Sequence, residues 1–403
     1  MERRLHAVVL PPGPRLYGAL TAALDGSGPA ICPLSPDLPA PALRGLLGTL
    51  APHAVETEDG VQPYRAADPA TPTASTTPAD PATPADPGAP AAPGTAVLIA
   101  TSGSTGTPKI VELSATAVLH SATATLARIG AGPGDRWLCC VPTSHISGIL
   151  VLARALLGGA APVIHPRFDP ASVEAAGDVH IAMVPTQLRR LLDAGTDLGA
   201  LGAIILGGAA ASPGLLAEAR GRGARVFTTY GMSETSGGCV YDGVPLDGVR
   251  AAVGDDGRIR LAGEVLFTGY RRRAALTAAV RDGEWFVTPD LGTVEDGRLR
   301  VRGRIDDVIN TGGEKVVAGE VATALSRHHK VRDVVVVGRP DPEWGERVTA
   351  VVVPAADAPA LAELRAWVRE TMPVHAAPHE LELVEAIPLL PSGKPDRALL
   401  RHA

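Results

Sequence analysis

Lysine is scarce in this chain. Its 37 Lys and Arg residues include only four lysines, Lys109, Lys315, Lys330 and Lys394. Arginine serves wherever either cation would do, so a lysine is expected where a compact ammonium on a flexible stem is required. Lys109, Lys315 and Lys394 stand in the motifs described below, whereas Lys330 ends a surface run after two histidines. Three of the four lysines are therefore candidate functional residues.

The chain also lacks long apolar runs and basic clusters. Its longest apolar stretch, 146–164, contains Arg154 and several glycines, so it is not a membrane span. The apolar residues before Pro11 are too few for a signal peptide. A net charge of −6 without a basic stripe argues against nucleic acid as the main partner. We therefore expect neither nucleic-acid binding nor membrane insertion.

Cysteine is rare, and its spacing does not suit a metal site. The four cysteines are Cys32, Cys139, Cys140 and Cys239. Reduced, buried thiols in a cytoplasmic protein are the expectation for such a set. A length of 403 residues suits two or three domains, and nothing in the sequence indicates the oligomeric state.

Residues 66–94 form a run of Pro, Ala, Thr and Asp with almost no large apolar side chains. Such a segment cannot offset the entropy of its own ordering by burying apolar surface. We therefore expect an exposed, largely disordered loop or linker between a small N-terminal piece and the rest of the chain.

After this segment, short apolar runs alternate with amphipathic stretches. The runs at 137–141, 180–184, 203–206 and 225–229 are predicted strands, and 114–129, 186–193 and 213–220 are predicted helices. This alternation predicts an α/β fold with mostly parallel sheets covered by helices.

A change of pattern follows residue 245. Short runs at 257–261, 265–267 and 285–287 among glycine turns predict a small β-rich subdomain. Beyond Gly303, helices at 318–327 and 361–371 and strands at 333–337 and 347–353 predict a separate α+β lid.

The richest motif spans residues 101–109, directly after an apolar strand predicted at 96–100. It holds Thr101, Ser102, Gly103, Ser104, Thr105 and Gly106, and it ends in Pro108-Lys109. A strand that runs into a loop rich in glycines and hydroxyls is typical of polyphosphate binding. It is not a Walker A loop, because Pro108 and Ile110 replace the second glycine and the magnesium-binding hydroxyl. A flexible linker is the alternative, but linkers rarely follow a buried strand.

This loop resembles the phosphate loop of the adenylate-forming superfamily, which includes acyl- and aryl-CoA synthetases, luciferases and adenylation domains. Further segments resemble the superfamily's motifs in the same order along the chain: 206–210, 228–235, 288–292, 303–316 and 391–397. One such segment would be weak support. Their shared order, which covers nearly everything after residue 96, makes the resemblance specific.

The resemblance implies a role for each motif residue. Thr101 to Gly106 and Lys109 would bind the phosphates of ATP, while Gly208 and Ala209 would border the adenine. Tyr230 would stack on that base beside Gly231, Ser233 would bind the α-phosphate, and Glu234 would hold Mg²⁺. Asp290 and Arg304 would bind the ribose, and Asp306 would be the hinge pivot. Gly312, Gly313 and Lys315 would approach CoA, and Lys394 would be the catalytic lysine. An aromatic face, a hydroxyl and a carboxylate suit a base, a phosphate and a hard cation respectively.

The resemblance also implies the domain plan and the mechanism. An AMP-binding domain would span 1–302, a hinge 303–307 and a lid 308–403. A carboxylate would attack the α-phosphorus of ATP, and the lid would then rotate so that CoA attacks the acyl-adenylate. ATP, Mg²⁺ and CoA are therefore the expected cofactors and co-substrates.

The run 230–249 resembles the actinobacterial o-succinylbenzoate–CoA ligases of menaquinone biosynthesis, and 340–345 fits them too. Ile110 and the run 148–154 depart from their pattern, which bears on the substrate more than on the reaction. His145 matches a family histidine beside the acyl pocket and could also assist catalysis. Arg154 either binds a substrate carboxylate or reaches the surface. A ligase that loads a carrier-protein thiol and a non-catalytic nucleotide-binding protein stay open as alternatives.

Overall fold

The computed structural model describes residues 3–65, 88, 90–101, 108–390 and 393–402. Most of the predicted loop at 66–94 therefore lies outside the described residues. The same is true of Ser102, Gly103, Ser104, Thr105 and Gly106. Within the described ranges, no helix is both long and apolar enough to cross a bilayer. All four cysteines are buried and free, as the sequence predicts.

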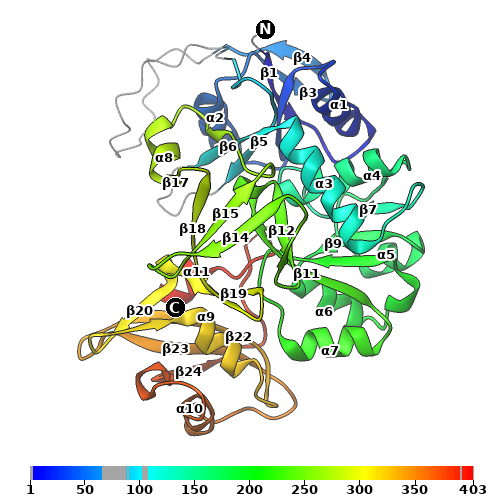
Figure 1. Cartoon of the computed structure of the whole chain (residues 1–403). Coiled ribbons are helices and arrows are strands. Elements are labelled where there is room, and N and C mark those ends of the chain that lie inside the picture. Colours follow the sequence, from blue (N-terminus) through cyan, green and yellow to red (C-terminus); the bar gives the residue numbers. More distant parts are fainter. Residues whose placement is uncertain (1–2, 66–87, 89, 102–107, 391–392, 403) are drawn as a thin grey trace.

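A seven-stranded sheet with a parallel centre and antiparallel edges forms the upper part of the molecule (Figure 1). In spatial order its strands are β16 (Gly269–Tyr270), β6 (Lys109–Ser114), β5 (Thr95–Thr101), β2 (Ala30–Leu34), β1 (Leu5–Val9), β3 (Ala54–Thr57) and β4 (Gly60–Pro63). The edge strand β16 comes from far later in the chain than its neighbour β6, with which it pairs antiparallel.

A second seven-stranded sheet carries the predicted parallel strands. In spatial order these are β13 (Val244–Pro245), β12 (Gly237–Tyr241), β11 (Arg225–Met232), β10 (Ala203–Leu206), β9 (His180–Met183), β7 (Trp137–Cys139) and β8 (Val163–Ile164). The pairs from β11 to β8 are parallel, while β12 folds back antiparallel on β11. All four strands predicted between 137 and 229 are present here.

Helices cover these sheets on both faces. One apolar core joins the two sheets through α1 (Pro14–Asp25), α3 (Ala115–Ile129) and α4 (Ile146–Gly158). A second core packs α5 (Pro170–Ala176), α6 (Pro185–Asp193) and α7 (Pro213–Gly221) on the second sheet. A third core packs α2 (Ala40–Leu50) on the first sheet. Local chemistry fixes the helix ends: the Ser114 hydroxyl accepts from the Ala117 N–H at 3.0 Å, and Gly130 ends α3 in the left-handed region.

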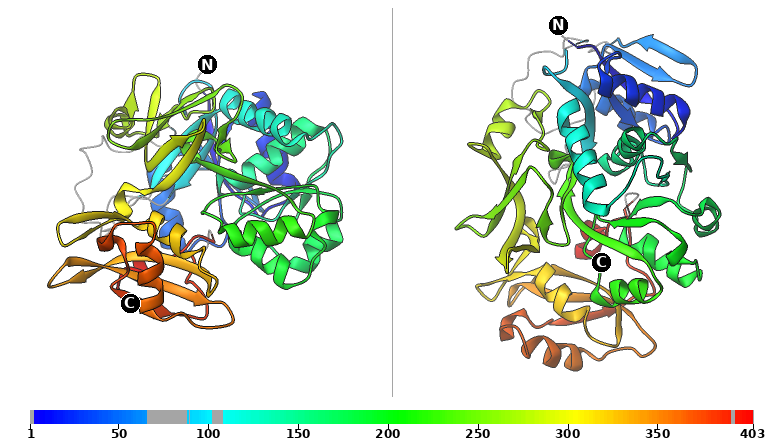
Figure 2. Two further views of the ribbon diagram at one scale, coloured as in Figure 1. Left: turned by 60° about the horizontal axis from the view of Figure 1, so that its bottom comes forward. Right: turned by 45° about the vertical axis from the view of Figure 1, so that its right-hand side comes forward.

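The remaining chain forms the predicted β-rich subdomain and lid. The subdomain contains β14 (Val249–Val253), β15 (Arg258–Gly263), α8 (Ala274–Ala279), β17 (Arg281–Asp282), β18 (Trp285–Glu295) and β19 (Arg298–Arg304). The lid contains β20 (Val308–Thr311), β21 (Glu314–Val317), α9 (Ala318–Leu325), β22 (Val331–Asp341), β23 (Gly345–Pro354), α10 (Leu361–Arg369), β24 (Glu380–Leu383) and α11 (Arg397–His402). The lid lies at the bottom of Figure 1 and of the right view in Figure 2. The predicted α/β fold class is confirmed.

Two local predictions are wrong. Residues 265–267 form a turn instead of a strand, because both Val265 and Phe267 are buried there and the Phe267 N–H donates to the Glu234 carbonyl at 2.8 Å. The exposed loop predicted to reach residue 94 ends earlier. Ala91 is buried and forms an isolated bridge with Arg3, since this short stretch covers the edge of the apolar core that contains β1.

Candidate active site

The carboxyl ends of the parallel strands β9, β10 and β11 meet at one edge of the second sheet. Leu206 of β10 is in register with Met183 and with Thr228. Val184 follows β9 directly, Gly208 lies two residues beyond the end of β10, and Tyr230 lies in β11 two residues beyond Thr228. Ligands of open α/β sheets bind at this edge, so the predicted adenine-side turn and the predicted adenine-stacking tyrosine lie together.

The lid brings Lys394 to this edge. The Lys394 Cε lies 3.9 Å from the position that a β-carbon on Gly208 would occupy. A β-carbon on the neighbouring Gly393 would lie 3.0 Å from the Val184 side chain. The predicted catalytic lysine and the predicted nucleotide-binding turn therefore share one site although they are far apart in the sequence.

Tyr230 borders a cavity of about 250 Å³. Its lining is mainly aliphatic, with Leu206, Leu216 and Val240 among the side chains, and it also includes Thr228 and Thr229. A mainly aliphatic cavity with an aromatic wall and a few hydroxyls fits a nucleobase. The Tyr230 hydroxyl donates to the Asp290 Oδ2 at 2.9 Å, so the ring is held beside a carboxylate.

Asp290 is a buried carboxylate, only 6% exposed. Burial raises its pKa, and Arg304 at 3.4 Å and the Tyr230 hydroxyl oppose that rise. The Thr288 hydroxyl accepts from the Asp290 N–H at 3.2 Å and fixes the turn. An ordered carboxylate hydrogen-bonded to Tyr230 can accept hydrogen bonds from sugar hydroxyls, which is compatible with the predicted ribose role; that role stays a prediction.

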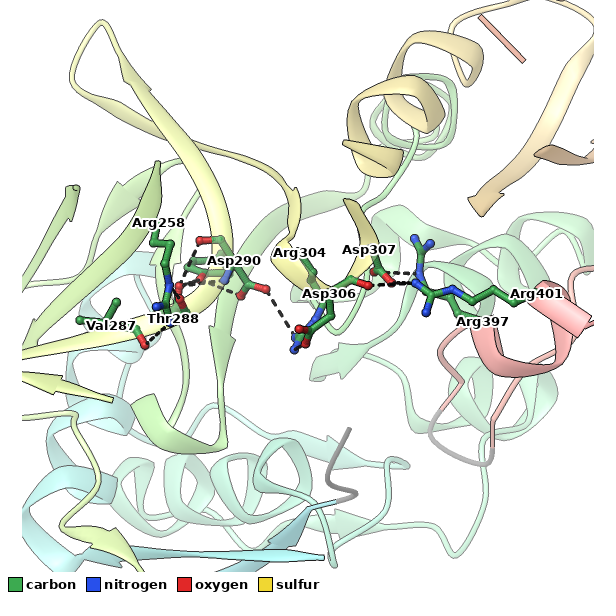
Figure 3. A network of polar contacts seen from close by, with 10 residues as sticks. Arg258, Val287, Thr288, Asp290, Arg304, Asp306, Asp307, Arg397 and Arg401 are labelled. Carbon is green, nitrogen blue, oxygen red and sulfur yellow. Dashed lines mark hydrogen bonds and ion pairs between the residues drawn. The ribbon is translucent and has the colours of Figure 1, made fainter. Parts of the chain in front are cut away.

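Figure 3 shows how this carboxylate connects to the hinge and the C-terminal helix. Arg304 lies 3.4 Å from Asp290 and 3.6 Å from Asp306. Asp307 pairs with Arg397 at 3.4 Å and with Arg401 at 2.8 Å, and Arg401 also donates to the Asp306 carbonyl at 3.1 Å. The predicted hinge therefore lies between Asp290 and α11. The pivot role of Asp306 stays a prediction.

Glu234 is the candidate magnesium ligand, and its partner was missed in the sequence. The Tyr270 hydroxyl donates to Glu234 Oε1 at 2.8 Å, and the Lys109 ammonium lies 5.6 Å from the centre of the Tyr270 ring. The part of the chain that the structure describes holds no group of three His, Cys, Asp or Glu able to bind a metal. Mg²⁺ commonly takes one or two carboxylates plus substrate phosphates, so one glutamate beside a triphosphate fits that ion.

The charges around Lys394 and His145 show which predicted residues gather at the site. Burial and the nearby Arg304 lower the pKa of Lys394, while Asp290 and Glu234 raise it. Loss of hydration lowers the pKa of His145, and the charge of Lys394 lowers it further. Residues from three other predicted motifs therefore act on the Lys394 ammonium, and that ammonium acts on His145 in the segment before α4.

Arg154 is placed differently. His145 caps the start of α4, and nine residues later the helix has turned through about two and a half turns, so Arg154 leaves from the opposite face. Its side chain is only 2% exposed, so the alternative of a surface arginine is wrong. The guanidinium lies 3.4 Å from the Thr125 hydroxyl, 3.5 Å from the Tyr241 hydroxyl and 5.4 Å from the centre of the Trp137 ring.

The predicted CoA loop forms the tight turn between β20 and β21. Gly312 and Gly313 have φ of 58° and 84°, which a two-residue hairpin turn requires, and Lys315 is exposed. The Gly312 N–H donates to the Trp344 carbonyl at 2.9 Å, and the indole ring leaves no space for a β-carbon on Gly312. In Figure 1 the β20 hairpin lies at the outer side of the lid. Its contact with CoA stays a prediction.

Two predicted glycine and hydroxyl positions have structural explanations. A β-carbon on Gly231 would lie 2.0 Å from the Gly237 carbonyl, so the close pairing of β11 with β12 requires glycine there. Thr101 ends β5, and its hydroxyl donates to the Lys109 carbonyl at 3.2 Å, which closes the base of the predicted phosphate loop. Ser233 begins the short 3₁₀ turn that contains Glu234.

Comparison with known proteins identifies the family of this chain. Residues 5–270 match the family described as AMP-binding enzyme, and residues 320–394 match the AMP-binding enzyme C-terminal domain. A Mycobacterium tuberculosis (strain CDC 1551 / Oshkosh) protein named "Probable 2-succinylbenzoate--CoA ligase" is 42% identical over 322 residues, which cover 76% of this chain and 83% of that protein.

Solved structures give the same result. The o-succinylbenzoate CoA synthetase (MenE) of Bacillus subtilis, in complex with the acyl-adenylate intermediate OSB-AMP, superposes with a TM-score of 0.79 at 26% identity, over 99% of this chain and 88% of that chain. The amide bond synthetase McbA of Marinactinospora thermotolerans gives 0.83 at 26% identity, over 100% and 90%. The chain therefore belongs to the AMP-binding enzyme family and is related within it to the 2-succinylbenzoate–CoA ligases.

Proposed function

We propose that this protein is an ATP-dependent ligase that converts 2-succinylbenzoate to its CoA thioester in menaquinone biosynthesis, with release of AMP and pyrophosphate. The family, the names of its relatives and the grouping of motif residues around Lys394 support the reaction type. The domain plan is an AMP-binding part at 1–302, a hinge at 303–307 and a lid at 308–403. We expect a cytoplasmic enzyme, because the proposed substrates ATP and CoA are available there.

The choice of acid rests on the buried guanidinium of Arg154. No Asp or Glu among the described residues pairs with its buried guanidinium, and its Nε has no hydrogen-bond partner there. Burial lowers the pKa of Arg154, and Tyr241 is the group that opposes this effect. The free-energy cost of burying a charge is offset when the charge pairs with an anion. The second carboxylate of 2-succinylbenzoate supplies such an anion, and a guanidinium can bind it through two parallel hydrogen bonds.

Strand β12 links Arg154 to the nucleotide site. Its first residue, Gly237, pairs with Met232, next to Ser233 and Glu234, and its last residue, Tyr241, contacts Arg154. Four residues of strand span about 13 Å. The two carboxylates of 2-succinylbenzoate are only six bonds apart, so the Arg154 side chain would have to extend along β12 toward the α-phosphate to bind the second one. Leu150 of α4 packs on Gly237 and would have to move aside.

In the first half-reaction, the aliphatic carboxylate attacks the α-phosphorus of ATP, the bond to the bridging oxygen breaks, and pyrophosphate leaves. Both reactants are anions, so catalysis depends on neutralising charge and aligning the groups. Lys394 holds its proton between the attacking carboxylate and the α-phosphate. Tyr230 and Asp290 bind the nucleoside, and Lys109 neutralises the outer phosphates. Mg²⁺ held by Glu234 would supply further positive charge at the phosphates.

In the second half-reaction, the CoA thiol attacks the acyl carbonyl, AMP leaves with the former anhydride oxygen, and the thiol proton is released. Lys394 has no part in this step. Rotation of the lid at Asp306 would withdraw Lys394 and bring Gly312, Gly313 and Lys315 to the site.

A panel of carboxylic acids with ATP, Mg²⁺ and CoA, analysed for thioesters by mass, tests the function. We expect 2-succinylbenzoyl-CoA as the main product, and pyrophosphate release that requires the acid. Release without acid would indicate a different nucleotide reaction. A thioester formed only with a carrier protein would mean that a carrier thiol, not CoA, accepts the acyl group. An amide formed from an added amine would mean that the amine is the acceptor.

A further inference from the structure

Tyr270 contacts both Glu234 and Lys109, which belong to two different sequence motifs. We propose that Tyr270 is a positioning residue for the triphosphate of ATP: its hydroxyl orients Glu234, and its ring supports the ammonium of Lys109. The proposal rests on the ATP-dependent function above, but it does not depend on which acid is activated.

Strand pairing places Tyr270 on the same face as Lys109. In the antiparallel pair of β16 and β6, Tyr270 lies opposite Val111. Side chains opposite one another share a face of the sheet, and Lys109 shares the face of Val111 because it is two residues away. The Lys109 ammonium accordingly lies 5.6 Å from the centre of the Tyr270 ring, within the range of a cation–π contact.

The turn before β16 brings the Tyr270 hydroxyl to Glu234. The Phe267 N–H donates to the Glu234 carbonyl at 2.8 Å, and the Ser236 hydroxyl donates to the Val265 carbonyl at 2.8 Å. These bonds fix the backbone on both sides of the contact. The phenol then donates to Glu234 Oε1 at 2.8 Å.

Burial makes this contact rigid. Tyr270 is 6% exposed, and its ring packs against that of Phe267 at 5.0 Å between centroids. Its backbone N–H donates to the Thr277 hydroxyl at 2.9 Å. A side chain held in this way can fix the direction of a carboxylate and of an ammonium before the nucleotide arrives. Glu234 would then present its other oxygen to a magnesium-bound triphosphate, with Lys109 beside the outer phosphates.

Nucleotide binding measured by calorimetry on the whole protein tests the proposal. We would compare wild type, Tyr270→Phe and Tyr270→Leu, with Tyr17→Phe on α1 as a matched change of a partly buried tyrosine elsewhere. The ligands are ATP with Mg²⁺, ATP with a chelator, and AMP. AMP lacks the outer phosphates, so it reports the nucleoside site alone.

For Tyr270→Phe we expect about tenfold weaker binding of ATP with Mg²⁺, as for loss of one hydrogen bond to a charged group. Binding of AMP, and of ATP with a chelator, should change less than about twofold. Tyr270→Leu should also weaken ATP without Mg²⁺, because Lys109 loses the ring. In a Glu234→Gln background, Tyr270→Phe should have little further effect, since the two groups act together.

Wild-type affinity for ATP with Mg²⁺ in Tyr270→Phe would overturn the proposal, and so would an equal loss of AMP affinity. Additive losses in the Glu234→Gln background would also contradict it. If the wild type itself binds no ATP, the ATP-dependent function falls, and this role of Tyr270 falls with it.

Discussion

The Lys394 side chain rests against Gly208, with Cε 3.9 Å from where a β-carbon of Gly208 would lie. Gly208 has a φ of 81° and belongs to the turn after β10, whereas Lys394 belongs to the lid near the C-terminus. This contact places the lysine among Asp290, Glu234 and Arg304. We interpret this lid position as the one suited to forming the acyl-adenylate.

Lys394→Ala should therefore abolish acyl-adenylate formation, measured as acid-dependent pyrophosphate release. The same variant should still convert a supplied acyl-adenylate to the thioester, because the lysine is not used after the lid rotates. Lys330→Ala is the matched control, since Lys330 pairs with Glu363 within the lid at 2.8 Å. Equal loss of both half-reactions in a folded Lys394→Ala protein would contradict the two-position mechanism.

The effect of restricting the hinge backbone should differ from the effect of removing the hinge side chain. Asp306→Pro fixes φ and removes an N–H, so we expect thioester formation to collapse while adenylate formation largely survives. Asp306→Ala removes only the carboxylate that lies 3.6 Å from Arg304, and its effect should be small. The single-turnover rate of each half-reaction would be measured for both variants. Normal turnover in Asp306→Pro would exclude Asp306 as the pivot.

The rate should fall at high pH as Lys394 loses its proton. Burial and Arg304 place the pKa of Lys394 below its ordinary value of 10.5. The group is charged below its own pKa, so kcat/KM for ATP should decline at a pH lower than 10.5. Arg304→Gln removes a neighbouring cation, raises the pKa of Lys394 and should move this decline to higher pH. A decline that stays in place would mean that another group causes it.

Much of the fold can be predicted from the sequence, because the local signals for helix starts and strands agree with the tertiary structure. Ser114 before α3 and proline at the start of α6 and α7 mark helix starts, and the strands from β7 to β11 read as short apolar runs. The turn at 265–267 was missed because three apolar residues in a row do not distinguish a buried strand from a buried turn.

The sequence predicts the site residues that lie in continuous motifs. It does not predict the contacts between residues of strands that are far apart in the chain. Tyr270 meets Glu234 and Lys109 only because β16 pairs with β6, a pairing between segments about 160 residues apart that no local pattern indicates. The face of Arg154 was undetermined because α4 is apolar on nearly all sides, so its periodicity selects no direction. The roles assigned to single residues stay predictions until they are measured.

Arg154 is proposed to bind the second carboxylate of the substrate. The most direct test of this role compares kcat/KM for 2-succinylbenzoate and for 3-benzoylpropionate, which lacks the ring carboxylate, in wild type and in Arg154→Leu. The exposed Arg136→Leu serves as the control. Melting temperature should not fall in Arg154→Leu, because the change removes a buried charge that has no carboxylate partner among the described residues.

We predict that the wild type prefers 2-succinylbenzoate by about 2–5 kcal/mol, roughly thirtyfold or more, and that Arg154→Leu loses this preference with an unchanged KM for ATP. A preference that survives in Arg154→Leu, or a wild type that uses both acids equally well, would contradict the account.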